Sequence, residues 1–369
     1  MNGQWIGFYT GTSDGMLMMN VDDRGSHFEG VGYLRPNDQK IPTTGVGFRT
    51  TNRDETFRFE TSNLWAIHPI TGNATGWEDI KSLYPDGFIP AERADVEGDW
   101  DVNRLRLSWR TNIGTVGSAS LPRSKAAEPS DLPAVQMRWA DFKQHVSPLS
   151  GKGHLFRGQS GPWRLRTAFH RTSRADLLRF VNEDIRVLHR RLSLRTRHVF
   201  NLANADENGA FFNLVQHHGY PTPLLDWSYS PFVAAFFAYR GVTKKHVADK
   251  NPEDRVRIFT LDKRWRSDVN QIIALERAFP HFSVAEFIAI DNERLIPQQS
   301  VSTITNVDDI ESYVRTMETS NKQSYLSAID LPACDRSEVY CELAFMGITA
   351  GALFPGLDGA CEELRERNF

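Results

Sequence analysis

The side chains best suited to chemistry lie in one stretch, residues 216–230, where polar groups surround a Gly/Pro turn. The stretch reads Gln-His-His-Gly-Tyr-Pro-Thr-Pro-Leu-Leu-Asp-Trp-Ser-Tyr-Ser, and an apolar run follows it. Packing at the edge of a core has little use for two imidazoles, a carboxylate, an indole and two hydroxyls together. We therefore expect a binding or catalytic site here.

Two hydroxyls follow the buried strand that we expect before them. Ser228 and Ser230 are two positions apart, so at a strand end they point to one side and can hydrogen-bond one sugar or amide. A helix that starts directly afterwards adds free N–H groups. Helix capping would use only one hydroxyl, which leaves the other, with Asp226 and Trp227, unexplained.

His217 and His218 could hold a metal, act as a general base or donate to a phosphate. Adjacent residues of a helix do not share a face, so we expect no two-point metal site from this pair. One histidine should face the pocket and the other should be structural. Asp226 is interpreted as an orienting or structural carboxylate, because the Trp227 that follows it suggests burial.

An Arg-Gly dipeptide lies upstream, at the expected end of another strand. The guanidinium of Arg157 could bind a phosphate or ribose bidentately, and Gly158 would let a ligand approach the backbone. The alternative is a structural arginine paired with Asp226 or another acid. Residues 157–198 contain many arginines and three acids, which indicates either a phosphate-facing patch or a solvated helix face.

Periodicity divides the chain into three parts. Residues 1–121 show short period-two runs between Gly and Asp turns, which predict an antiparallel barrel or sandwich. Tryptophans at 65, 77 and 100 there could mark a binding face or pack in a core. Residues 122–134 are polar and proline-punctuated, as in a linker. Residues 135–369 mix helical and strand periods, including a helix expected to be capped by Ser173, so the chain is predicted to be α+β.

Composition narrows the function classes. The net charge is −3, and Gly-rich phosphate loops, HExxH and GxSxG are absent, which argues against P-loop ATPases, metalloproteases and α/β-hydrolases. The start of the chain lacks a signal-peptide pattern, and no stretch approaches about 18 apolar residues. Three cysteines show no metal spacing. We expect a cytoplasmic protein with reduced thiols and no bound metal.

Residues 135–369 resemble the FRG domain, named for its Phe-Arg-Gly triplet. The motifs that carry the resemblance are Phe156-Arg157-Gly158-Gln159, Gln216-His217-His218-Gly219, Leu225-Asp226-Trp227-Ser228 and Leu353-Phe354-Pro355. The layout is more remotely similar to ADP-ribosyltransferases, which implies a split β-sheet core flanked by helices and NAD⁺ as substrate. In those enzymes an Arg or His on a first strand, a Ser- or Tyr-containing element before a helix and a late Glu act together.

The resemblance implies roles for particular residues. The residues implied to bind NAD⁺ are Arg157, Gly158, Gln159, His217, Asp226, Trp227, Tyr229 and Ser230, with Trp227 or Tyr229 beside the nicotinamide. The residues implied to be catalytic are His218, Ser228, Glu293 and Gln299. Gln299 lies where the late Glu is expected, and a glutamine cannot supply the negative charge that stabilises the transition state. Glu286, Glu293 or Asp226 could substitute for it.

The leading hypothesis is an NAD⁺-dependent ADP-ribosyltransferase, similar in plan to phage-defence toxins that modify RNA and are restrained by an antitoxin and a chaperone. RNA is the expected acceptor, because of the arginines in 157–198, and protein is the alternative. A second hypothesis is a non-catalytic FRG module that binds a nucleotide or a partner. A third is a nuclease or phosphotransferase that uses His217 or His218.

Overall fold

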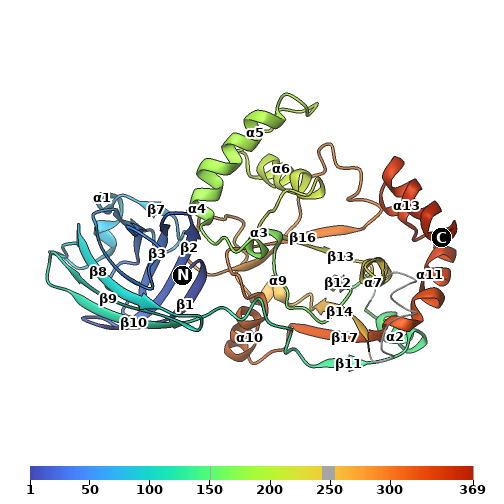
Figure 1. Ribbon diagram of the computed structural model, residues 1–369, viewed down its shortest axis with the longest axis horizontal. Helices are drawn as coiled ribbons and strands as arrows, with labels where there is room; N and C mark the ends of the chain where they lie inside the picture. Colours follow the sequence, from blue (N-terminus) through green and yellow to red (C-terminus); the bar gives the residue numbers. More distant parts are fainter. Residues whose placement is uncertain (150, 243–253, 369) are drawn as a thin grey trace.

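The computed structural model describes residues 1–149, 151–242 and 254–368, which form two sheet-based parts side by side (Figure 1). The first part is an N-terminal antiparallel sheet. The second is a mixed sheet covered by helices, from which the α5 and α6 region projects at the top of the view. The chain is thus α+β, as expected.

The N-terminal part is one curled sheet of ten strands in the order β5-β8-β9-β10-β1-β2-β3-β4-β6-β7, antiparallel throughout. The strands are β1 (Gly3–Gly11), β2 (Gly15–Asp23), β3 (Phe28–Pro36), β4 (Thr44–Arg49), β5 (Thr56–Thr61), β6 (Leu64–Ile67), β7 (Ala74–Thr75), β8 (Ala94–Trp100), β9 (Arg104–Thr111) and β10 (Val116–Pro122). A short helix, α1 (Trp77–Ile80), and a 3-10 turn, Lys81–Leu83, follow β7. The expected barrel or sandwich is therefore a single sheet that does not close. Alternate residues such as Trp5, Leu105 and Leu121 fill its interior.

The second sheet has seven strands in the order β11-β17-β14-β12-β13-β16-β15. They are β11 (Ala134–Gln136), β12 (Leu155–Gln159), β13 (Leu224–Ser228), β14 (Arg255–Leu261), β15 (Phe282–Ala285), β16 (Ser300–Thr305) and β17 (Leu326–Pro332). Only β11 and β17 run parallel. The two central strands, β12 and β13, share one residue pair, Phe156 with Ser228, whereas β12 pairs with β14 over five residues. The sheet is therefore nearly divided at its centre.

Helices lie on both faces of this sheet (Figure 1). They are α2 (Trp139–Val146), α3 (Ala168–Arg171), α4 (Leu177–Arg179), α5 (Arg186–Leu192), α6 (Ala205–His217), α7 (Pro231–Arg240), α9 (Trp265–Asp268), α10 (Ile310–Asn321), α11 (Arg336–Phe345), α12 (Ala350–Leu353) and α13 (Leu357–Asn368). A π-helical segment, Phe180–Ile185, joins α4 to α5, and a 3-10 turn, Ala333–Asp335, precedes α11. None of the helices in the described ranges is long and apolar enough to cross a membrane.

Local signals placed several helix ends correctly and one wrongly. Ser230 caps α7 by accepting from the Val233 N–H, and Gly219, at φ +83°, ends the turn after α6. Ser173, however, does not cap the next helix. It has φ +63°, and the side chain of Asp176 accepts from the Arg179 N–H three residues further on. Asp176 lies directly before α4, so it can reach the free N–H groups and Ser173 cannot.

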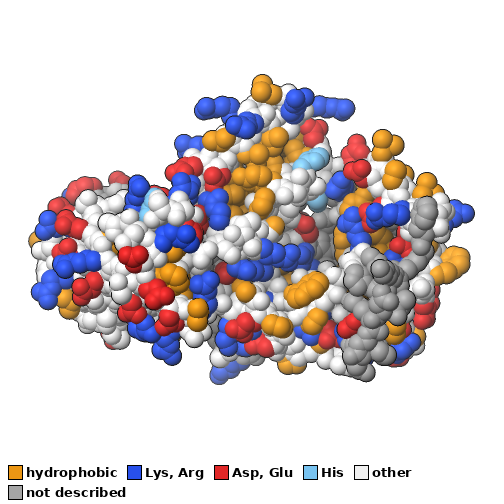
Figure 2. Space-filling model, viewed as in Figure 1, with side chains coloured by type: hydrophobic (Ala, Val, Ile, Leu, Met, Phe, Trp, Pro, Cys, Tyr) orange, Lys and Arg blue, Asp and Glu red, His pale blue; other side chains and the backbone are white. Residues whose placement is uncertain are grey.

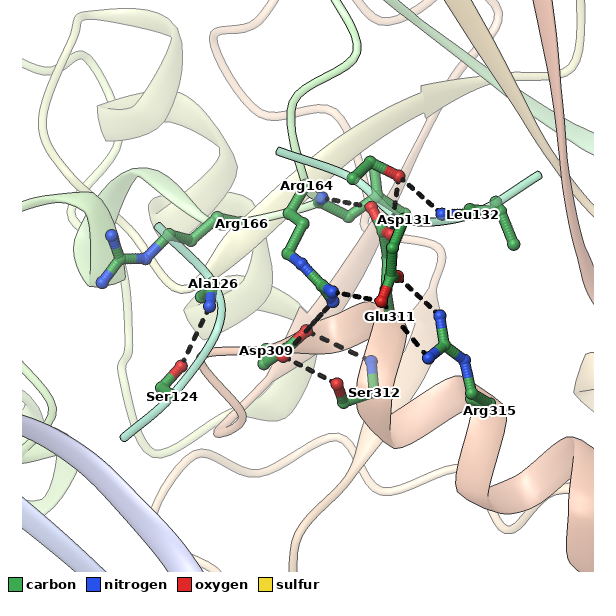
Figure 3. Close-up of polar contacts among 12 residues, drawn as sticks. Ser124, Ala126, Asp131, Leu132, Arg164, Arg166, Asp309, Glu311, Ser312 and Arg315 are labelled. Atoms are coloured by element: carbon green, nitrogen blue, oxygen red, sulfur yellow. Dashed lines mark hydrogen bonds and ion pairs between the residues drawn. The ribbon is translucent and has the colours of Figure 1, made fainter. Parts of the chain in front are cut away.

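The expected linker is held against the second domain by ion pairs and hydrogen bonds (Figure 3). Arg164, only 1% exposed, pairs with Asp131 of the linker at 2.8 Å and with Asp309 before α10 at 3.1 Å. The Ser130 hydroxyl donates to Glu311 at 2.7 Å, and Asp131 also pairs with Arg315 of α10. A proline-punctuated sequence is therefore fixed in place by charges from elsewhere in the chain.

The first sheet also touches the second domain directly. The carboxylate of Asp22 in β2 accepts from the main-chain N–H groups of Ala175 and Asp176 at 2.9 and 3.2 Å, and it pairs with Arg174. Near the start of β1, the Gln4 amide donates to the carbonyl of Asn306 at 2.7 Å. These contacts fix one domain against the other at the start of α4.

Candidate functional site

Arg157 occupies the division between β12 and β13. Its Nη1 donates to the main-chain carbonyl of Asp226 at 2.5 Å, at a place where the two strands share no ladder hydrogen bond. Among the described residues, Arg157 Nε and Asp226 Oδ1 are buried and have no hydrogen-bond partner. Burial lowers the pKa of Arg157 to about 10; Asp226 opposes this shift and Arg171 adds to it. The guanidinium therefore stays charged at neutral pH and lies close to a carboxylate with unused bonding capacity.

Gly158 serves packing rather than ligand access. A Cβ at this position would lie 1.9 Å from the carbonyl oxygen of Ala234 and 2.6 Å from the amide nitrogen of Ala238, both in α7. The helix crosses β12 at that point, and only a residue without a side chain allows the approach. The expectation that Gly158 opens the backbone to a ligand is therefore corrected.

Gln159 and Trp227 are also engaged inside the fold. The Gln159 side chain is buried and donates to the carbonyl of Trp163 at 2.7 Å. Trp227 is 3% exposed, and its indole N–H donates to the hydroxyl of Thr303 at 3.0 Å. Strand alternation turns Trp227 into the core, so the expected place beside a nicotinamide is corrected for this residue.

The two hydroxyls after β13 have partners within the protein. Ser228 donates to the carbonyl of Gln298 at 2.7 Å and accepts from the Ser230 N–H at 3.0 Å. Ser230 caps α7, and both side chains are buried. They lie close together, as their spacing predicts, but their hydrogen bonds fasten the start of α7 to the segment before β16. Neither lines the cavity described below.

Tyr229 belongs to a separate polar group. Its hydroxyl donates to Glu286 at 2.5 Å and contacts Arg266, which itself pairs with Glu286 at 2.7 Å. Burial raises the pKa of Tyr229, and the hydrogen bond to Glu286 adds to this while Arg266 opposes it. Glu286 is thus paired away from the cavity.

His217 and His218 line a cavity of about 810 Å³ between the ends of α5 and α6, residues 291–294 and Pro355. His217 is half-buried at the end of α6, with Nδ1 2.6 Å from the side-chain amide of Asn292. Burial lowers its pKa, while Asp226 opposes this shift. In the neutral ring, Nδ1 accepts from the Asn292 amide N–H and Nε2 carries the proton. His218 is exposed on the same wall.

The charges around this cavity are mainly positive. Arg195, Arg197 and Arg294 line it, against Asp291 and Glu293. The Arg294 guanidinium also donates to the carbonyl of His217 at 3.3 Å, which ties the 291–294 segment to α6. Such a wall suits an anionic group of a ligand, and the carboxylates of Asp291 and Glu293 would lie close to it.

The candidates for the late acid separate in space. Glu293 is exposed, lines the cavity and forms no hydrogen bond or ion pair with any described residue. Gln299 is exposed at a left-handed position, φ +47°, and does not line the cavity; its carbonyl accepts from the Tyr229 N–H at 3.0 Å. Geometry therefore favours Glu293 over Gln299.

The arginines of 157–198 fall into two groups. Four of those before α5 pair with acids, namely Arg164, Arg166, Arg174 and Arg179, whereas Arg157 and Arg171 have no ion pair with a described residue. Those along and after α5 are exposed and have no ion pair with a described residue: Arg186, Arg190, Arg191, Arg195 and Arg197. Figure 2 shows basic side chains around this projecting end. The arginines along and after α5 thus lie on a solvated surface, and that they face phosphates stays a prediction.

Asn292 and Arg294 were not expected at the site. They lie in the run Asp291-Asn292-Glu293-Arg294, outside the motifs quoted above. The polarity of this run is the one feature of the sequence that could have indicated a site there. In the described ranges, no group of three or more His, Cys, Asp or Glu side chains could hold a metal ion.

Comparisons with known proteins give one family and a likeness of fold. A family model described as FRG domain matches residues 152–247. No curated protein matches the chain. The N-terminal sheet resembles redesigned β-barrels. One of them, mFAP1 bound to DFHBI, is 16% identical, with a TM-score of 0.23, over 33% of this chain and 94% of that one. Another, b11L5F_LGL, is 12% identical, with a TM-score of 0.22, over 33% and 90%.

Proposed function

Since residues 152–247 of this chain form an FRG domain, we propose that the protein is an NAD⁺-dependent ADP-ribosyltransferase whose substrate lies in the cavity beside α5 and α6. The position of His217 carries this proposal. His217 lines the cavity, and the charge of the Asp226 carboxylate acts on its imidazole. The main-chain carbonyl of Asp226 accepts a hydrogen bond from Arg157. We take the division of the sheet and the cavity together as one site.

The cavity fits a dinucleotide in size and charge. Its volume of about 810 Å³ falls within the roughly 300–1,000 Å³ of small-molecule sites. Arg195, Arg197 and Arg294 can hold the pyrophosphate through bidentate hydrogen bonds. The half-buried ring of Tyr220 on the same wall offers a surface for a base.

In the reaction we propose, the bond between the nicotinamide nitrogen and the ribose carbon breaks, and nicotinamide leaves with the electron pair. The carboxylate of Glu293 stabilises the positive charge that develops on the ribose. An oxygen or nitrogen of the acceptor then bonds to that carbon and gives its proton to the imidazole of His218. His218, exposed on the same wall, would hold the acceptor.

RNA is the acceptor that we propose, with protein as the alternative, because the unpaired arginines along α5 lead to the cavity. An RNA-modifying toxin of phage defence, restrained by an antitoxin and a chaperone, is the corresponding cellular role. The internal bonding of Ser228 and Ser230 favours a second candidate, a nucleotide-binding module without catalysis, because it removes one expected catalytic group, Ser228, and one expected NAD⁺-binding group, Ser230. A His-dependent nuclease is third; loss of RNA integrity without NAD⁺ would support it.

Calorimetry with NAD⁺ and mass spectrometry of RNA and protein after incubation test the proposal. Glu293→Gln should bind NAD⁺ within about threefold of the unaltered protein and lose roughly 10²–10³ of the transfer rate. Arg294→Ala should weaken binding by about tenfold or more, since a guanidinium–phosphate contact contributes about 1.5–3 kcal/mol. Glu286→Gln, outside the cavity, is the control and should change neither. Binding of NAD⁺ without its consumption would support the non-catalytic module. Absence of NAD⁺ binding would contradict both the transferase and the module.

A further inference from the structure

The N-terminal sheet encloses a second cavity, of about 710 Å³, at a distance from the site described above. Every second residue of several strands faces it, including Leu17 and Met19 of β2, Val46 and Phe48 of β4, and Leu107 of β9. Protein interiors are close-packed, with few voids larger than a water molecule. A space this large is therefore not part of an ordinary core.

The buried core of the same domain borders this cavity. Trp5, Phe28 and Leu121 form a buried cluster with the inner residues of β8 and β9. Leu17, Met19, Phe48 and Leu107 belong to that cluster and also line the cavity, together with Trp77 of α1 and Phe88 of the segment after it. The cavity is thus a space bordered by core side chains, beside Trp5, Phe28 and Leu121, which do not line it.

Aromatic rings on the cavity wall keep exposed faces. Phe59, Trp77, Phe88 and Trp109 are only half-buried although they line a concave space. The indole of Trp109 lies over Gly117 of the neighbouring strand, where a Cβ would come within 2.2 Å of the ring. Glycine at 117 therefore leaves room for this ring against the neighbouring strand.

The wall can be reached from solvent and has little charge. Ile89, Ile113 and Val116 line the cavity and are 69%, 42% and 41% exposed. Glu92 is the one charged side chain on a wall that lies wholly within the described residues, and no Lys, Arg or His lines it. An anion would lose its hydration here without gaining a cationic partner. An uncharged ring has little hydration to lose, and a cation would gain contact with the faces of the indole rings.

We propose that this cavity binds an aromatic small molecule that is neutral or cationic. Its rings would lie against Trp77, Phe88 and Trp109, and a positive charge would face Glu92. The site is independent of the NAD⁺ cavity, which has the opposite charge preference. It adjoins the domain interface, because β2 lines the cavity through Leu17 and Met19 and contacts the second domain through Asp22.

Fluorescent probes of different charge test the proposal on the full chain. Nile red, which is neutral, and thioflavin T, which is cationic, should each bind at least tenfold more tightly than the anion anilinonaphthalene sulfonate. Equal or tighter binding of the anion would overturn the proposal, as would absence of binding by the first two.

Substitutions test the location of the bound probe. Ala66→Trp from β6 and Val46→Trp from β4 place a ring in the cavity and should weaken Nile red binding at least tenfold. Phe8→Ser removes an aromatic ring that is 77% exposed and does not line the cavity, so binding should stay within twofold. Unchanged binding in a folded Ala66→Trp protein, or loss in Phe8→Ser, contradicts the assignment.

Hydrogen exchange on the unaltered protein locates the site even if the cavity-filling variants fail to fold. Saturating Nile red should slow exchange in residues 85–93 and 105–116, which line and cover the cavity. Slowed exchange confined to other segments would place the probe elsewhere and overturn the proposal.

Discussion

Gly158 of β12 and Ala234 of α7 approach so closely that a Cβ on the glycine would lie 1.9 Å from the alanine carbonyl oxygen. The helix is thereby held against the strand that carries Arg157, one residue away. Ser230 at the start of α7 and Ser228 at the end of β13 fasten the other end of the same helix. The Phe-Arg-Gly triplet thus combines a packing residue with a charged one.

Gly158→Ala should lower the free energy of unfolding by about 3 kcal/mol or more, since the backbone of α7 must move to admit the methyl group. Urea denaturation measures this. Gly76→Ala is a matched control, because the added carbon there meets only the carboxylate of Asp79, at 3.0 Å. Its effect should be below about 1 kcal/mol, within the range of a weak helix cap. Equal effects at both sites would contradict the packing role of Gly158.

Ser230→Ala should destabilise the protein by about 1 kcal/mol through loss of the cap on α7. Ser230→Thr keeps a hydroxyl and should restore most of that stability. NAD⁺ binding, measured by calorimetry at a temperature where both variants are folded, should not change. Lost binding at unchanged stability would instead return this hydroxyl to the ligand.

Asp176→Asn should change how stability depends on pH. Burial, together with the nearby charge of Asp22, raises the pKa of Asp176 to about 7 from an ordinary 3.8, although the Arg179 N–H and Arg174 oppose the shift. A raised pKa means that the folded state binds the proton more tightly. The stability this supplies is full below about pH 4 and is lost as pH rises through about 7. Asparagine can still cap α4 but does not titrate.

The stability of Asp176→Asn relative to the unaltered protein should therefore rise between about pH 4 and pH 7, by on the order of 2–4 kcal/mol, and level off above. Urea denaturation of both proteins from pH 4.5 to 8 measures the difference between their free energies of unfolding. Other titrating groups are the same in both proteins, so their contributions largely cancel in this difference. A difference independent of pH would show that this carboxyl is not protonated in the folded state.

Arg164→Met should cost about 3–5 kcal/mol, because it leaves the carboxylate of Asp309 buried without its partner. Asp131→Asn removes a carboxylate that is 45% exposed and should cost below about 1 kcal/mol. Figure 3 shows both residues in the group that holds the linker. Trypsin should cut near Arg123 and Lys125 faster in Arg164→Met than in Asp131→Asn. Cleavage no faster in either variant than in the unaltered protein would mean that the ion pairs do not hold the linker.

The sequence determined those features whose causes lie within a few residues. The strand at β13, the proline start and serine cap of α7, and the glycine that ends the turn after α6 follow from alternation, capping and φ preference. Ser173 does not cap α4 because it lies too far before the helix, whereas Asp176 directly precedes it.

Tertiary structure alone decided which partner each polar group has. The Ser228 hydroxyl meets the carbonyl of Gln298, seventy positions away, and His217 meets Asn292 and Arg294. A hydrogen-bonding group accepts many partners of similar energy, and the pattern of residues around it does not choose among them. Only the packing of distant segments chooses the partner. The same packing leaves the two cavities, beside α5 and α6 and within the N-terminal sheet, which no local sequence pattern predicts.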